Sequence, residues 1–150
     1  MTQSGERSWE FPIEWGKVRE FARAVQDDHA GAEPPVPPPT FPVIVTAEFV
    51  ERLIVEELRL DRRRVVHGEQ EYEYFRPLRV GDRLACRARV AEEYVKAGQR
   101  GGRMRFIVLE TEMRDPASGD LVVRERSTAI EITPAEGEPA EGEPAEGEPA

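Results

Sequence analysis

The sequence predicts an α+β fold in which one antiparallel sheet wraps around a single apolar helix. Three observations carry this prediction. Apolar residues recur at helical spacing over residues 15–27, a second and more apolar helical pattern covers residues 43–58, and from residue 66 onward apolar and polar residues alternate with the period of strands. Helices followed by a run of strands joined by short turns favour an antiparallel sheet.

The first helix is predicted from one apolar stripe with charged residues on the opposite side. The stripe consists of Trp15, Val18, Phe21, Ala22 and Val25, and two aspartates at 27 and 28 end it. Residues 34–42 then hold six prolines in nine, too many for a helix or a central strand. We interpret them as a stiff connector; an SH3-type ligand is the alternative.

The second helix is predicted to be buried, because it is apolar around most of its circumference. Thr40 is its expected N-cap, and Pro42 lies in the first turn, where a missing N–H costs nothing. One stripe is formed by Val43, Ala47, Val50, Ile54 and Leu58. Arginines at 62–64 are expected to interact with the negative end of the helix, and a phosphate site is the alternative.

Four strands are predicted after the second helix. In the first, Val66, Gly68, Gln70, Tyr72 and Tyr74 form one face, and His67 and three glutamates form the other. The next three contain residues 84–90, 104–109 and 121–132, with turns at 77–82 and 115–120. Residues 98–102 lack the Lys-Ser/Thr of a phosphate loop and are predicted to be a hairpin loop.

Charge is concentrated at the C-terminus. The 150 residues include 21 Lys or Arg and 30 Asp or Glu, for a net charge of −9. Residues 134–150 repeat Pro-Ala-Glu-Gly-Glu and contain six of the glutamates and no basic residue, which leaves −3 on residues 1–133. Such a repeat cannot bury enough surface to fold, so we predict a disordered tail; a docking peptide is the alternative.

Composition excludes several classes of protein. A domain of charge near −3 has no electrostatic footprint for nucleic acid or an anionic membrane. No apolar run could span a membrane, and the N-terminus lacks the apolar stretch of a secretory signal. One cysteine and two histidines give no disulfide and no convincing metal site. The expectation is a cytoplasmic protein with one domain and no cofactor.

Few residues are candidates for chemistry. Asp27, Asp28 and His29 could form a metal site or an acid–base pair, but a solvated helix end explains them as well. His67 precedes Gly68 in a strand, where glycine marks a bulge or the close approach of a ligand or another backbone. A structural role for His67 stays open beside a functional one. Cys86 lies in phase with apolar residues and is predicted to be a buried, inert thiol.

Four segments together resemble the MaoC-like hot-dog dehydratases. They are the helix around Val18–Val25, Pro-Pro-Thr-Phe-Pro at 38–42, Val-His-Gly-Glu-Gln at 66–70, and Arg-Pro-Leu-Arg-Val-Gly-Asp at 76–82. The resemblance covers residues 10–133 and is greatest to the N-terminal type and the non-catalytic subunit of (3R)-hydroxyacyl-acyl-carrier-protein dehydratases. It implies a hot-dog fold, dimers formed by sheet pairing, and acyl-thioester substrates carried on acyl carrier protein or CoA.

The chain departs from the family at the catalytic motif. Catalytic members carry Gly-Asp-x-Asn-Pro-x-His after the first helix, and Asp27 matches the aspartate. The histidine position falls on Ala32, and Asn-Pro is replaced by His29-Ala30. Dehydration needs one group to remove the proton beside the thioester carbonyl and another to protonate the leaving hydroxyl. We therefore expect no catalytic residue in this chain.

The leading hypothesis is a non-catalytic subunit of a 3-hydroxyacyl-thioester dehydratase or enoyl hydratase in fatty acid metabolism. It would shape the acyl tunnel and stabilise a hot-dog partner that carries the Asp and His. The expected substrate-binding residues, where the second helix begins beside the first predicted strand, are Thr40, Phe41, His67, Gly68 and Gln70. The alternatives are an acyl-thioester-binding or structural homodimer, and a thioesterase that uses Asp27 or Glu69.

Overall fold

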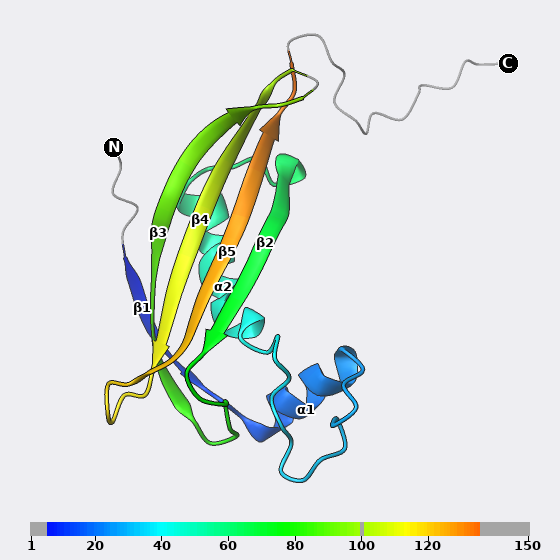
Figure 1. Ribbon diagram of the computed structural model, residues 1–150, viewed down its shortest axis with the longest axis vertical. Coiled ribbons are helices and arrows are strands. Elements are labelled where there is room, and N and C mark those ends of the chain that lie inside the picture. Colours follow the sequence, from blue (N-terminus) through cyan, green and yellow to red (C-terminus); the bar gives the residue numbers. More distant parts are fainter. Residues whose placement is uncertain (1–5, 100, 136–150) are drawn as a thin grey trace, which may run out of the picture.

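The computed structural model describes residues 6–99 and 101–135, which form five antiparallel strands and two α-helices. The strands are β1 (Arg7–Pro12), β2 (Val65–Tyr74), β3 (Arg83–Ala97), β4 (Arg103–Arg114) and β5 (Leu121–Thr133), in the spatial order β1-β3-β4-β5-β2. Helix α2 (Val43–Arg52) lies along one face of the twisted sheet, and α1 (Trp15–Ala24) lies beyond the end of the sheet (Figure 1). This arrangement confirms the predicted α+β hot-dog fold.

The last four strands lie where the alternation predicts them, but β1 was not predicted. Residues 7–12 pair with β3 as an antiparallel edge strand. Their sequence, Arg-Ser-Trp-Glu-Phe-Pro, is short and ends in proline. Such a segment is not recognisable as a strand from its own pattern, and it forms one here because it pairs with β3. The sheet therefore has two edges, β1 and β2.

Helix α1 confirms the first predicted helix but ends earlier than residue 27. Gln26 adopts a left-handed backbone with φ of 56°, and the Asp27 N–H donates to the carbonyl of Ala22. This hydrogen bond, from an N–H beyond the helix to a carbonyl of its last turn, caps the C-terminus of α1. Val18 and Ala22 are buried, and Phe21 meets the fully buried Phe41 edge-on at 5.5 Å.

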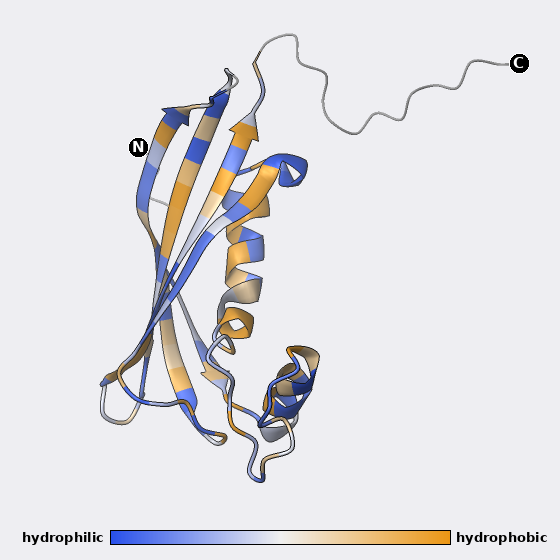
Figure 2. Ribbon diagram, turned by 45° about the vertical axis from the view of Figure 1, so that its right-hand side comes forward, coloured by the Kyte–Doolittle hydropathy of each residue, from blue (hydrophilic) through white to orange (hydrophobic). Residues whose placement is uncertain are grey.

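Two predictions about the second helix are wrong. Thr40 is not the N-cap: Pro42 occupies that position, with no side-chain cap. The helical segment is also not buried around most of its circumference: Val45, Thr46, Phe49 and Leu53 are buried, whereas Val43 is 38% exposed. The reason is that α2 lies against the sheet along one side only (Figure 2).

Helix α2 continues into the π-helical turn η1 (Leu53–Glu57), and Arg59, with φ of 49°, ends it. The arginine cluster forms a 3₁₀ turn, η2 (Arg62–Arg64), which Asp61 caps by accepting from the Arg63 N–H. Each of the three arginines makes an ion pair with a carboxylate, either Asp61 or Glu51. These pairs leave the phosphate-site alternative without support.

Gly68 forms the predicted irregularity in β2. The register with β5 shifts between His67 and Glu69, which is a β-bulge. The bulge changes which residues of β2 share a face. Gln70 and Tyr72 lie opposite the buried residues Ser127 and Glu125. Beyond the bulge, His67 and not Gly68 lies opposite a buried residue, Ala129. Val66 is consequently 46% exposed.

Candidate functional site

A buried carboxyl group links α2 to the neighbouring strands β5 and β2. Glu125 on β5 is only 2% exposed and is the one buried acidic or basic residue of the described chain. Its Oε1 accepts a hydrogen bond of 3.0 Å from the Thr46 hydroxyl on α2 and one of 2.8 Å from Gln70 Nε2 on β2. Its Oε2 is buried and has no hydrogen-bond partner. Such an unpaired buried oxygen requires an explanation.

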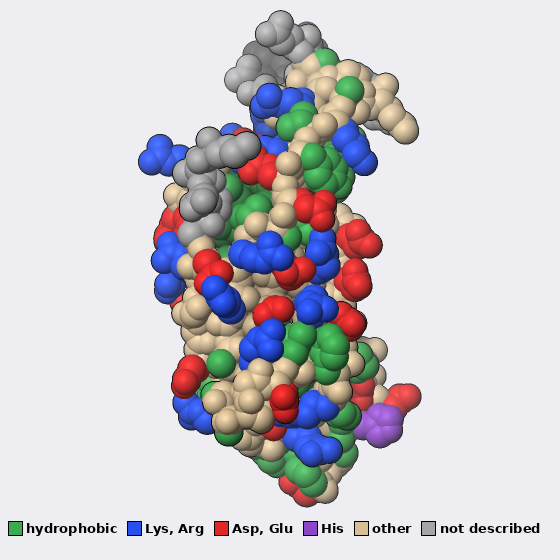
Figure 3. Space-filling view, turned by 60° about the vertical axis from the view of Figure 1, so that its left-hand side comes forward, with side chains coloured by type: hydrophobic (Ala, Val, Ile, Leu, Met, Phe, Trp, Pro, Cys, Tyr) green, Lys and Arg blue, Asp and Glu red, His purple; other side chains and the backbone are tan. Residues whose placement is uncertain are grey.

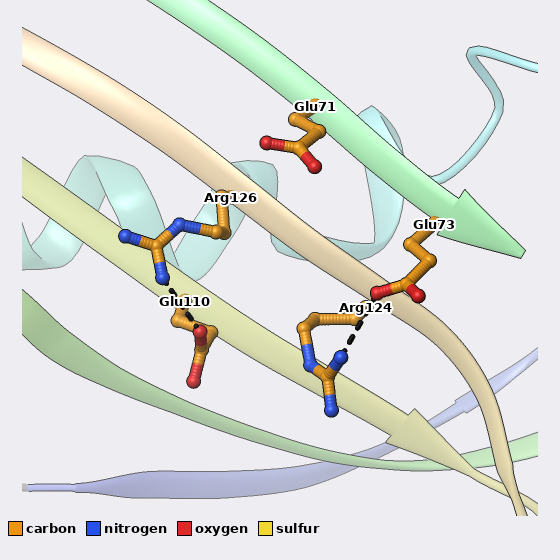
Figure 4. Close-up of a pocket in the computed structure, with 5 residues that line it drawn as sticks. All are labelled: Glu71, Glu73, Glu110, Arg124 and Arg126. Carbon is orange, nitrogen blue, oxygen red and sulfur yellow. Dashed lines mark hydrogen bonds and ion pairs between the residues drawn. The ribbon is translucent and has the colours of Figure 1, made fainter.

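Burial raises the pKa of Glu125 to about 7, although the hydrogen bonds from Gln70 and Thr46 act in the opposite direction. The neighbouring arginines do not neutralise it. Arg124 and Arg126 point to the other face of the sheet, where they pair with Glu73, Glu110 and other carboxylates around a shallow pocket (Figure 4). Glu125 is therefore a carboxyl group that changes charge near neutral pH inside the core.

Three further titratable side chains lie near Glu125. Burial, reinforced by the charge of Glu125, raises the pKa of Tyr74 to about 12 and that of Cys86 to about 12, and it raises the pKa of Tyr72 beyond that range. All three stay neutral at physiological pH. Cys86 is 2% exposed, which confirms the prediction of a buried thiol of low reactivity.

The structure separates the residues that the sequence groups into a substrate site. Thr40 is exposed at the end of the proline-rich connector, whereas Phe41 is fully buried and packs in the core with Phe21. His67 and Gly68 are exposed at the bulge on edge strand β2. The carbonyl groups of Thr40 and Phe41 accept backbone hydrogen bonds from the first turn of α2, whereas Gln70 is linked to α2 through Glu125.

The segment that matches the catalytic motif forms an exposed turn. Asp27 Oδ1 accepts from the backbone N–H of His29 at 2.8 Å and lies 3.5 Å from His29 Nδ1. The His29 side chain is 76% exposed, so it lies in solvent and not in a cleft. The arrangement matches the solvated helix end considered above. Across the described residues, no group of three or more His, Cys, Asp or Glu could hold a metal ion.

A groove of about 400 Å³ lies between β1 and α2. Its floor is apolar, and Trp9 of β1 stacks on Phe49 of α2 with ring centroids 5.5 Å apart. Charged side chains form its rim, and one pair, Arg7 with Glu57, bridges from β1 to η1. The sequence did not indicate this groove, because β1 was not predicted.

Glu125 was also missed, although a signal existed. In the last strand, Val123, Glu125, Ser127 and Ala129 share one face, and all four are buried. A glutamate in phase with valine and alanine indicates a buried carboxyl group.

On the surface, basic and acidic side chains are interspersed, without a patch of one sign on the face seen in Figure 3. None of the described helices is long and apolar enough to cross a membrane.

Comparison with known proteins agrees with this architecture. Residues 2–125 match the family described as "FAS1-like, dehydratase domain region". The chain belongs to this family. It is 36% identical to a UPF0336 protein of Thermobifida fusca, over 71% of this chain and 74% of the relative, and 39% identical to one of Clavibacter michiganensis, over 76% and 80%.

Solved structures of dehydratases share the fold of this family member. A MaoC-like dehydratase superposes with a TM-score of 0.68 at 26% identity, covering 85% of this chain and 41% of that chain. A chain of the C-terminally truncated HadBC (3R-hydroxyacyl-ACP dehydratase) complex from Mycobacterium tuberculosis superposes with a TM-score of 0.63 at 24% identity, covering 86% and 98%. The resemblance drawn from the sequence motifs is thereby confirmed: this is a hot-dog protein of the dehydratase and hydratase family.

Proposed function

We propose that this chain is the non-catalytic subunit of a (3R)-3-hydroxyacyl-thioester dehydratase or enoyl hydratase, with an acyl group carried on acyl carrier protein or CoA. The observation that carries the proposal is the exposed turn at 27–32. It offers one aspartate that matches the motif, Asp27, whose carboxylate already accepts a backbone hydrogen bond, and alanine at the position of the family's histidine. One carboxylate cannot serve as both the base and the acid of the reaction.

The missing histidine and aspartate would come from a second hot-dog chain. Edge strand β2 supports such pairing, because its ten residues present an unpaired backbone edge. Apolar side chains on this strand and on the adjacent helical region are exposed, among them Val43, Val55 and Val66. The related HadBC structure is itself named as a complex. Pairing of β2 with a second chain would bury apolar side chains of this kind, and stable interfaces bury apolar surface.

The groove between β1 and α2 supports binding of an acyl chain. Its volume falls within the range of small-molecule sites, and aromatic and aliphatic side chains line its floor. Of the five residues expected from the sequence, Thr40 and Phe41 lie before α2, while the three on β2 remain a proposed thioester site. There Gln70 is oriented by Glu125, and His67 and Gly68 lie on the strand where the partner would dock.

The test is turnover by the purified chain alone and together with a hot-dog chain that carries the complete Asp-x-x-x-x-His spacing. We expect no hydration of 2-enoyl-thioesters by the chain alone and robust hydration by the pair. Asp27→Asn and His29→Ala should leave the pair active, because neither residue of this chain performs the chemistry. Turnover by the homogeneous chain that either substitution abolishes would overturn the proposal.

A further inference from the structure

Glu125 is the point at which α2, β2 and β5 are tied together by side chains in the core. Its Oε1 receives one donor from each of the other two elements, Thr46 Oγ1 and Gln70 Nε2. The function proposed above uses this carboxyl group only to orient Gln70, and its second oxygen is buried without a partner. Burial without a hydrogen-bond partner favours the neutral, protonated form of such a carboxyl group.

The Thr46 hydroxyl can serve either protonation state. It has one proton and two acceptors within reach, Glu125 Oε1 at 3.0 Å and the carbonyl oxygen of Val43 at 3.3 Å. When Oε1 carries a proton, Glu125 donates to Thr46, and Thr46 donates to Val43 in the first turn of α2. When Glu125 is ionised, Thr46 must donate to the carboxylate instead, and Val43 loses that bond. The ionised form also leaves a charged oxygen unsolvated, which costs more than an unpaired neutral one.

Neighbouring groups do not offset this charge. From β2, Tyr72 and Tyr74 face the carboxyl group, and from β3 Cys86 does; none of the three carries a positive charge. Helix α2 contributes the uncharged Thr46. On β5 itself, Arg124 and Arg126 pair with carboxylates on the opposite face. His67 lies further along β2, opposite Ala129.

We propose that Glu125 is a proton-operated latch between α2 and β2. In its neutral form the chain of hydrogen bonds from Gln70 through Glu125 and Thr46 to Val43 holds the start of α2 against the edge strand. Ionisation breaks this chain and favours a state in which α2 and β2 separate enough for water to reach the carboxylate. The latch is a property of this chain alone and does not depend on the function proposed above.

The experiment is amide hydrogen exchange, read by mass spectrometry on the full chain at about pH 6 and about pH 8 and corrected for intrinsic exchange rates. We expect protection of residues 43–52 and 65–74 to fall about tenfold at the higher pH, relative to the β3–β4 hairpin in the same sample. Glu125→Gln keeps the shape and the neutral charge, so its protection should not change with pH. Glu112→Gln, on the neighbouring strand, removes an arginine-paired carboxylate and should behave as the wild type does.

Two results would overturn the latch: protection that is independent of pH in the wild type, or pH dependence that survives in Glu125→Gln. If Glu125→Gln does not fold, the wild-type chain still provides a test through carbon-13 NMR of its side-chain carboxyl groups. A Glu125 carboxyl signal that titrates in the ordinary range of glutamate contradicts the proposal. Thr46→Val provides a second variant, because loss of the hydroxyl should move the exchange transition to higher pH.

Discussion

At the level of single side chains, Glu125 links the free energy of unfolding to pH in the direction opposite to most carboxylates. Burial raises its pKa from 4.5 to about 7 in the folded chain, so the folded state binds the proton more tightly than the unfolded state. Its contribution is fully present below about pH 4.5 and is lost as pH rises to about 7. Each pKa unit corresponds to about 1.4 kcal/mol, so the loss is at most about 3 kcal/mol.

We therefore predict that Glu125→Gln raises the free energy of unfolding relative to the wild type at about pH 8 and changes it little at about pH 5. Urea unfolding at both pH values measures the difference. Glu112→Gln is the control of opposite sign, because Arg114 and Arg124 hold the pKa of Glu112 below its ordinary value. Stability from Glu112 is lost as pH falls. Equal effects of the two substitutions on the pH profile would contradict this account.

At the level of elements, the bulge in β2 brings the backbone of Gly68 close to the Ile130 side chain on β5. A Cβ atom there would lie 2.6 Å from Ile130 Cδ1 and 3.1 Å from Ile130 Cγ1 on β5. We predict that Gly68→Val lowers the free energy of unfolding by about 1–3 kcal/mol, and that Ile130→Ala added to it recovers part of the loss. Urea midpoints measure both effects.

Gly16→Ala is the matched control for the bulge. Gly16 lies in α1 with nothing within 4 Å of its Cβ position, so alanine should raise stability by about 0.5–1 kcal/mol. A Gly68→Ala variant as stable as Gly16→Ala would show that β2 does not need the glycine. If instead Gly68→Val keeps a stable chain but prevents association with a hot-dog partner, the bulge belongs to the interface and not to a substrate site.

Element positions were predictable where a pattern is local, and less so where it depends on distant contacts. The alternation at 121–132 predicted β5, and Gly68 predicted the irregularity in β2. The second helix was predicted to be buried around most of its circumference, but Val45 and Phe49 are buried and Val43 is exposed, because a wide apolar surface carries little information about which side meets the sheet. The site residues failed to cluster for a similar reason. Phe41 is adjacent to Thr40 in sequence, but core packing with α1 turns it inward.

At the level of the whole molecule, the acidic tail and the folded domain are predicted to be independent. The tail repeat falls almost entirely outside the described residues, which end at Ala135. We predict that deleting residues 136–150 shifts the melting temperature by less than about 2 °C, since the segment contains no apolar side chain larger than proline. Differential scanning calorimetry of both lengths at equal ionic strength is the measurement. A larger loss would show that the tail docks on the domain.

The two edges of the sheet differ, and that difference determines how far such sheets can extend. β2 offers ten residues, whereas β1 offers six, with Arg7 at one end and Pro12, which lacks an N–H, at the other. Joining two β2 edges about a twofold axis leaves β1 outermost beside residues 83–88 of β3, where Pro12 disfavours a further strand. Residues 89–97 of β3 extend beyond β1. The joined sheet is then finite, since an isologous contact uses the same surface on both partners and leaves none for a third. A contact between two different edges could instead be repeated from chain to chain without closing, and the isologous contact avoids that route to fibres.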